Sequence, residues 1–195
     1  NDKYRPMTIA ESQLVLREAL INAGFAADDA EADEIILDPV NGFGLKPDVN
    51  TDWRDVVTQN GAQSQYSLNL SGGNERTSFY ASAGVFRQEG TTIATDFKRY
   101  NGALAVTHKA TDKITLSTSL SLGTSKQRTP TNGGTFANPV LAAHFLAPWY
   151  SPYNEDGSFK WDDPENQFPT NGGIFNTVIQ AAWNKNQAVQ TTLRG

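Results

Sequence analysis

The stretch ITLSTSLSL at residues 114–122 decides the fold, because its apolar and polar side chains alternate strictly. Four aliphatic residues and Thr118 occupy one set of alternate positions, and Thr or Ser occupies every position between them. Successive side chains of a strand point to opposite faces. The period of two therefore predicts a β-strand with one apolar face and one polar face.

The same period recurs in three earlier segments, at residues 65–71, 77–86 and 100–108. Short turns close the first and third connections, whereas residues 89–98 form a longer link. Gly72 and Gly73, in the first turn, are expected to supply left-handed backbone for a tight hairpin. The pattern predicts four antiparallel strands, joined by alternating short and long connections.

Two architectures fit these strands. A soluble β-sandwich hides the apolar face against a second sheet, and its strands usually have about five or six residues. A transmembrane β-barrel turns the apolar face to lipid and needs strands of roughly 9–11 residues. Strand length, small hydroxyl side chains on the polar face and alternating connection lengths favour the barrel, while periodicity by itself leaves both architectures open.

Most of the remaining segments lack the period-two alternation of the strands. Helices are expected through residues 13–21, begun by Thr8 or Ser12 and ended by Gly24, and through residues 28–36. A long stretch dense in Pro, Gly, Asn and aromatic residues follows the fourth strand, and a fifth strand begins after it. The chain thus divides into an irregular and helical insertion at 1–49, strands at 50–123, an aromatic-rich loop at 124–186 and the start of a strand at 187–195.

Composition excludes several functions. The chain of 195 residues carries a net charge of -5, which argues against a nucleic-acid binder. It contains no Cys and only two histidines, His108 and His144, without carboxylates at metal-ligand spacing. No nucleophile motif of a hydrolase is present. We therefore expect neither enzyme activity nor a metal or other cofactor.

Four motifs resemble the SusC/RagA family of TonB-dependent outer-membrane transporters. In order along the chain they are NTDW at 50–53, YSLNLSGGNE at 66–75, FYASAGVFRQEG at 79–90 and DFKRYN at 96–101. The stretch PYNEDGS at 152–158 is also similar to that family. The order and spacing of these motifs make the resemblance specific over residues 50–123 and partial over 140–160.

The resemblance implies that the chain is a segment of about four or five strands from a larger, 22-stranded antiparallel barrel in the bacterial outer membrane. It implies import of glycans or peptides, a SusD-like lipoprotein over the extracellular mouth, and energy from the TonB–ExbB–ExbD system. Because the chain begins with Asn1 and four or five strands cannot close a barrel, we expect it to be part of a longer protein.

In such a barrel, one face of the strands meets lipid and the other meets the plug or lumen. The residues expected to face lipid are Tyr66, Phe79, Leu104, Leu116 and Leu120. The residues expected to face the plug or lumen are Tyr80, Ser82, Asn101, Thr115, Ser117 and Ser119. The Gly72–Gly73 turn is expected at the periplasmic rim, and Glu89, Gly90 and Asp96 on the extracellular side.

The long loop holds the candidate contact residues. Aromatic faces together with amide and carboxylate groups commonly hold sugars in wet sites. The residues of this kind are Trp149, Tyr150, Tyr153, Asn154, Asp156, Trp161 and Asp162. Three roles remain open for them, namely packing of the loop on itself, contact with the lipoprotein, and contact with substrate. The alternative function is a secreted carbohydrate-binding β-sandwich.

Overall fold

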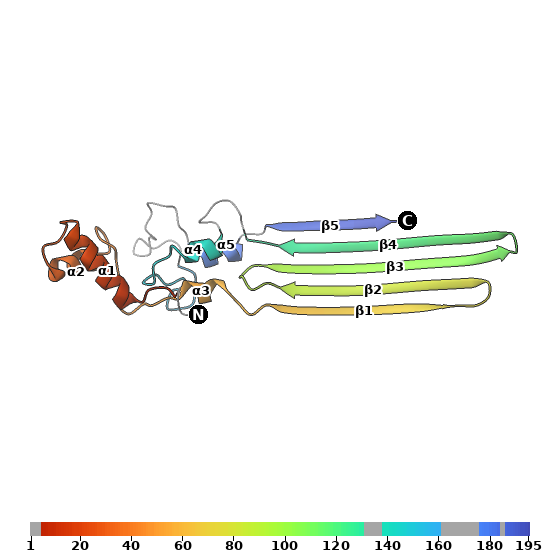
Figure 1. The fold of residues 1–195 in the computed structure, drawn as a ribbon, viewed down its shortest axis with the longest axis horizontal. Helices are drawn as coiled ribbons and strands as arrows, with labels where there is room; N and C mark the ends of the chain where they lie inside the picture. The colour runs from red at the N-terminus through yellow and green to blue at the C-terminus, as the bar shows by residue number, and fades with distance from the viewer. Residues whose placement is uncertain (1–4, 131–137, 161–175, 184–185) are drawn as a thin grey trace. The chain divides into compact units, whose positions relative to one another are not determined.

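The computed structural model describes residues 5–130, 138–160, 176–183 and 186–195. The chain divides into two compact units, which we call the helical unit and the sheet unit. The helical unit takes in Asn1–Gln59 and Thr131–Asn184, and the sheet unit takes in Asn60–Pro130 and Lys185–Gly195. Figure 1 shows the elements of each unit.

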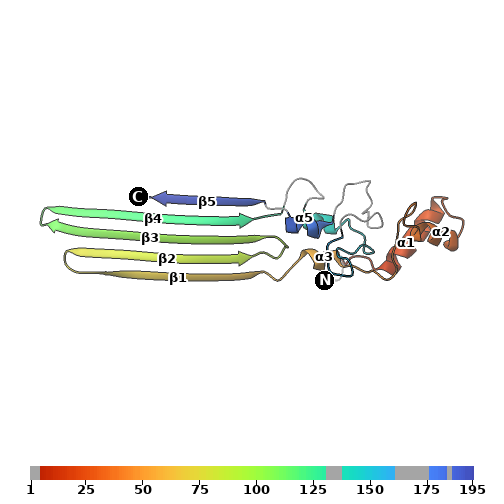
Figure 2. The same cartoon turned by 180° about the vertical axis from the view of Figure 1, so that it is seen from behind.

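The sheet unit is one antiparallel sheet whose strands follow the order of the chain, as Figures 1 and 2 show from its two sides. Its strands are β1 (Ala62–Gly73), β2 (Thr77–Glu89), β3 (Asp96–Thr111), β4 (Ile114–Arg128) and β5 (Gln187–Arg194). The first four strands have 12, 13, 16 and 15 residues. These lengths exceed the five to six residues typical of strands in globular proteins.

The turn between β1 and β2 corrects one expectation. Neither Gly72 nor Gly73 has a positive φ. The Asn74 side chain closes the turn instead, because its Oδ1 accepts hydrogen bonds from the backbone N–H groups of Arg76 (2.9 Å) and Thr77 (2.8 Å). Glycine is required at 73 for space, since a Cβ there would lie 2.3 Å from the Thr77 carbonyl oxygen.

The strand register confirms the predicted division into two faces. Residues directly opposite each other in an antiparallel pair share a face. Leu70 pairs with Ala81, Ala81 with Leu104, and Leu104 with Leu120, so an apolar row crosses four strands. The five residues predicted for the apolar face all lie on it, and the six predicted for the polar face all lie on the other.

The helical unit contains five helices among the described residues. They are α1 (Ile9–Asn22), α2 (Asp29–Leu37), α3 (Trp53–Val57), α4 (Pro139–Ala143) and α5 (Thr177–Trp183). Helix α1 contacts α2, and α3 contacts both α4 and α5. The segments 1–59 and 131–184 thus form a unit from parts of the chain that are far apart in sequence.

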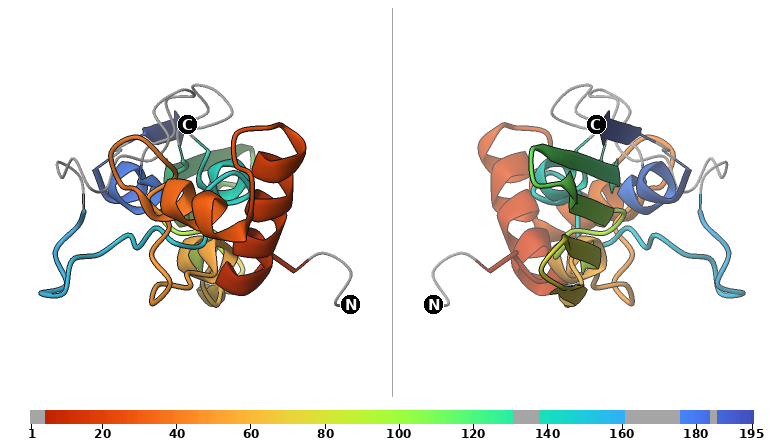
Figure 3. Two further views of the ribbon diagram at one scale, coloured as in Figure 1. Left: turned by 90° about the vertical axis from the view of Figure 1, so that its left-hand side faces the viewer. Right: turned by 90° about the vertical axis from the view of Figure 1, so that its right-hand side faces the viewer.

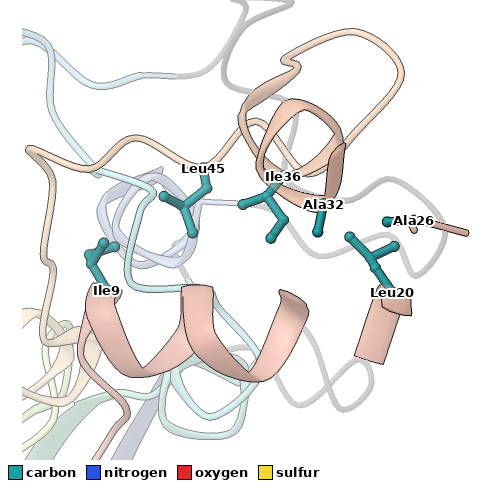
Figure 4. Packing of buried hydrophobic residues seen from close by; sticks show 6 residues of the cluster. All are labelled: Ile9, Leu20, Ala26, Ala32, Ile36 and Leu45. Atoms are coloured by element: carbon teal, nitrogen blue, oxygen red, sulfur yellow. The ribbon is translucent and has the colours of Figure 1, made fainter. Parts of the chain in front are cut away.

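Helices α1 and α2 lie side by side, as Figure 3 shows. Thr8 caps α1 in a capping box with Glu11, and Asp28 caps α2. Gly24, at φ +76°, follows α1 in the left-handed conformation that glycine adopts without strain. The two helices and the following segment enclose a small apolar cluster, drawn in Figure 4, of Ile9, Leu20, Ala26, Ala32, Ile36 and Leu45.

The elements differ in several places from those expected from the sequence. Strand β4 continues to Arg128, five residues past the expected strand end at 123. The stretch 124–186 is not one continuous loop, because α4 and α5 lie within it. Residues 53–57 form α3, which is too short for its apolar periodicity to be read from the sequence.

Candidate functional site

The candidate residues of the long loop belong to the helical unit, and Trp53 anchors that part of it. The Trp53 ring is 2% exposed, and its Nε1 donates a hydrogen bond to the Ala147 carbonyl oxygen at 2.8 Å. Close by, the Thr51 N–H donates to the Pro148 carbonyl oxygen at 2.7 Å. The NTDW motif therefore holds the segment that leads into Trp149.

Trp149 and Tyr150 are adjacent aromatic residues with different exposure. Trp149 is partly buried and packs against the apolar cluster of α1 and α2, whereas Tyr150 is buried, with 8% of its surface exposed. Their ring centroids lie 5.8 Å apart. Burial raises the pKa of the Tyr150 hydroxyl, which the neighbouring indole of Trp149 partly offsets. Tyr150 thus contributes packing inside the unit, and Trp149 reaches its surface.

Tyr153, Asn154 and Asp156 belong to a small hairpin that is held by its own hydrogen bonds. The rings of Tyr153 and Phe159 stack with centroids 5.7 Å apart across an isolated bridge. Asn154 N–H donates to the Ser158 carbonyl oxygen at 2.8 Å, and Gly157 takes up φ +80°. The hairpin projects Tyr153, which is 42% exposed, towards solvent.

The carboxylate of Asp156 accepts hydrogen bonds within the same turn. Its Oδ1 accepts from the Ser158 hydroxyl at 2.6 Å and from the Ser158 N–H at 2.9 Å. These hydrogen bonds, the hydroxyl first, lower the pKa of Asp156. The carboxylate is therefore charged at neutral pH, and because its residue is exposed it can still accept a bond from a ligand or a partner.

Asn176 ties the hairpin to α5. It is 4% exposed, and its Nδ2 donates to the carbonyl oxygens of Pro152 (2.9 Å) and Lys160 (3.0 Å). Its Oδ1 accepts from the Val178 N–H at 3.1 Å. One buried amide thus satisfies groups at both ends of the hairpin and at the start of the helix, which fixes the position of the hairpin within the helical unit.

A cleft of about 680 Å³ lies in the helical unit between α1 and the segment that follows α4. Its size falls in the range of small-molecule pockets. One wall carries Met7, Val15 and Leu16, and the other carries Phe145 and Trp149. Its polar lining comes from Arg5, Ser12, Arg54 and His144, and among the described residues the buried Ser12 Oγ has no hydrogen-bond partner.

The structure brings together only part of the predicted set. Trp149 lines the cleft, while Tyr153, Asn154 and Asp156 sit on the hairpin. Trp161 and Asp162 lie outside the described residues. Sequence reasoning missed the contribution of α1 to the cleft, because residues more than 130 positions apart meet there and no local pattern signals that contact.

The described part of the chain holds neither a metal-binding cluster nor a membrane-spanning helix. No group of three or more His, Cys, Asp or Glu side chains there could hold a metal ion. No helix in that part has the length and apolar character needed to cross a membrane.

Comparisons with known proteins find similarity to a TonB-dependent receptor and to a peptide transporter over part of the chain. A scan against protein-family profiles finds no match. A TonB-dependent receptor, P3, of Formosa agariphila is 29% identical over 118 residues, which cover 56% of this chain and 12% of the receptor. The chain thus spans about an eighth of the length of that relative.

Two solved structures are also similar. The structure of the RagAB peptide transporter aligns with a TM-score of 0.56 and 23% identity, over 80% of this chain and 19% of that one, which shows likeness of fold. The RagAB peptide importer in its closed-closed state aligns over 80% of this chain and 17% of that one with 26% identity, but its TM-score of 0.44 is too low to support an inference. The resemblance predicted from the motifs is thereby confirmed, since the chain is similar in sequence to a TonB-dependent receptor and in fold to a segment of the RagAB transporter.

Proposed function

We propose that this chain is a barrel segment of a TonB-dependent importer in the bacterial outer membrane. The observation that carries the proposal is the exposed apolar face of the sheet. Its leucines and aromatic residues keep large fractions of their surface uncovered, for example 71% for Leu68, 60% for Leu116 and 71% for Leu193. A contiguous apolar face of this extent marks contact with a membrane or a partner.

The pattern along and across the strands favours lipid as the contact. The opposite face carries small polar residues, which suit a wet lumen. On that face Tyr80 donates to Asn69 at 3.2 Å, and the hydroxyls of Thr107 and Ser117 lie 3.3 Å apart. In the proposal, further strands close the sheet into a barrel of 22, since an open sheet edge cannot persist in lipid.

The connections fit a barrel with one short-turn rim and one long-loop rim. The β1–β2 and β3–β4 turns lie at one end of the strands, and the β2–β3 connection and the long β4–β5 connection lie at the other. Outer-membrane barrels place short turns on the periplasmic side and long loops outside the cell. In this proposal, the chain therefore enters β1 and connects β4 to β5 on the extracellular side of the sheet.

The proposed cargo is a glycan or a peptide, delivered with the help of a SusD-like surface lipoprotein and released inward by TonB–ExbB–ExbD. The exposed Tyr153, Asn154 and Asp156 on the hairpin, and Trp149 at the cleft, are the residues we propose to contact the lipoprotein or the cargo. Tyr150 supports them from inside the unit. Trp161 and Asp162 stay in the proposed set on the basis of their residue types alone.

Cell fractionation tests the proposal. An antibody against residues 150–160 should detect a detergent-extractable outer-membrane protein several times heavier than 21.3 kDa. External protease on intact cells should remove the epitope, because the hairpin is proposed to face outwards. A soluble band near 21.3 kDa would contradict the proposal and favour the secreted β-sandwich.

A further inference from the structure

The apolar face of the sheet changes character in steps towards the end that carries the long connections. The apolar band ends at a row in which Tyr66 pairs with Val85, Val85 with Tyr100, and Tyr100 with Thr124. Tyr66 is 71% exposed and Tyr100 is 41% exposed. Tyrosines at this position match the aromatic girdle at a membrane interface, where the ring is buried and the hydroxyl is wet.

The row two residues beyond the tyrosines is basic. Arg87 pairs directly with Lys98, and Lys98 pairs directly with Lys126. These three residues, the basic row, lie side by side on the same face as the leucines, and all three are exposed. At about 3.3 Å per residue, the basic row lies roughly 7 Å along the strands from the tyrosines.

Three like charges in direct register are unfavourable unless anions lie nearby. Within the described part of the chain none of the three makes an ion pair. The nearest acids, Glu89 and Asp96, lie opposite each other in the next row outwards, where Arg128 lies opposite Asp96. These two carboxylates offset only part of the positive charge at this end of the face, which leaves room for anions from outside the segment.

We propose that the basic row binds the phosphate groups of lipids in the outer leaflet of the membrane. The inference rests on the proposed barrel function and adds to it the chemical class of lipid and the residues that bind it. The apolar band would lie against the acyl chains, and the tyrosines would lie at the level of the head groups. The three cations would contact the phosphates just beyond the tyrosines. Arg can bind a phosphate with two parallel hydrogen bonds, and Lys acts as a point charge.

The spacing along the strands is consistent with this placement. Tyr100 and His108 bound the apolar band on β3, and His108 pairs with Leu116 at its far end. Eight residues at about 3.3 Å span roughly 26 Å along the strand. A strand tilted by about 40° would then cross about 20 Å of membrane, close to the apolar band of about 25 Å in outer-membrane barrels.

The test uses the full-length transporter that contains this segment, purified in detergent and loaded with lipid A, either phosphorylated or with its phosphate removed. Native mass spectrometry would measure how much lipid stays bound. The wild type should retain phosphorylated lipid A in preference to the dephosphorylated form. The triple variant R87Q/K98Q/K126Q should lose that preference, with affinity falling on the order of a hundredfold if each cation contributes about fivefold near an anionic surface.

The matched control is the triple variant R76Q/K109Q/K113Q, which removes the same charge from the short-turn end of the sheet. It should bind phosphorylated lipid A like the wild type. Equal binding of the two lipid forms by the wild type, or equal losses in both variants, would overturn the inference. Heat-modifiable migration checks that the wild type and both variants insert into the outer membrane. If the proposed function is wrong, the wild type itself will not insert, so that failure can be told apart from failure of the lipid inference.

Discussion

In the sheet the leucines of one face stay exposed, whereas in the helical unit apolar side chains of similar size are buried. Leu70 and Leu122 are 59% and 53% exposed, while Ile36 and Leu45 are 0% and 2% exposed. The helical unit buries part of its apolar surface in its own cluster, while other apolar side chains of the unit, such as Leu14, stay exposed. The described sheet has no comparable buried cluster, and the proposed barrel would cover its apolar face with lipid.

The largest expected effect comes from breaking the interior of the helical unit. Trp53→Ala removes a buried ring and its hydrogen bond to Ala147, and substitutions of this size cost about 3–5 kcal/mol. In the full-length protein, the free energy of opening measured by amide hydrogen exchange in α3 and α4 should fall by that amount. Trp183→Ala is the control, because Trp183 is 61% exposed. Equal losses in both variants would show that burial does not explain the stability of this unit.

The next effect tests the environment of the sheet. Leu120→Arg places a charge in the middle of the apolar face, which costs about 2–4 kcal/mol at the centre of a membrane. Unfolding of the full-length protein by urea in liposomes measures the change. Ser119→Arg, one residue away on the polar face, should cost clearly less, since that face is proposed to be wet. A greater cost at Ser119 would reverse the assignment of the two faces.

A smaller effect is expected at the hairpin of the helical unit. Asn176→Ala leaves the carbonyl oxygens of Pro152 and Lys160 without their buried donor, which costs about 1–3 kcal/mol. Faster exchange of the Lys160 N–H, which donates to Pro152 at 3.1 Å, would report the loss. Asn154→Ala removes an exposed amide from the same hairpin and should have a clearly smaller effect. Identical exchange in the two variants would contradict the role given to Asn176.

The smallest effect is a pH dependence at the start of α1. The Arg5 guanidinium first, and then the hydrogen bonds from Thr8, lower the pKa of Glu11 from its ordinary 4.5 to about 2. A carboxyl with a lowered pKa stabilises the fold above its unfolded pKa, and that stability is lost as the pH falls through the folded value. Protection of the first turn of α1 should therefore decrease from about pH 4.5 towards pH 2.

Two variants check the origin of that pH dependence by hydrogen exchange. Glu11→Gln should remove it, because the titrating group is gone. Glu18→Gln takes the same charge from an exposed position on α1 and should leave it in place. A dependence that survives Glu11→Gln would assign it to another group, of which Asp33, paired with Arg17, is the first candidate because its pKa is also lowered.

Most of the sheet could be predicted because its signal is local. Strict alternation in residues 114–122 identifies both the strand and its two faces without knowledge of any neighbour. The turn at Asn74 could not be predicted in the same way. Two adjacent glycines suggest left-handed backbone, yet here Gly73 is needed because the Thr77 carbonyl approaches it closely. That approach depends on the partner strand.

The candidate site was less predictable because it depends on contacts between distant segments. From the sequence, Trp149 and Tyr150 are equally good candidates for contact residues. Only the packing of the unit shows that Tyr150 is buried and that Trp149 lines the cleft. The sequence marks Ser12 only as a possible helix start, and no local pattern places it in a cleft whose opposite wall comes from a distant segment.

The most direct test of the central claim is the accessibility of spin labels along β4. The segment itself has no Cys. In a full-length protein freed of any other cysteines, single cysteines can be introduced at each position from Leu116 to Leu122 and labelled with a nitroxide. In membranes, labels at Leu116, Leu120 and Leu122 should collide mainly with oxygen, which concentrates in lipid. Labels at Ser117, Ser119 and Ser121 should collide mainly with a water-soluble nickel complex. Leucine positions shielded from both reagents, as in the core of a sandwich, would contradict the account.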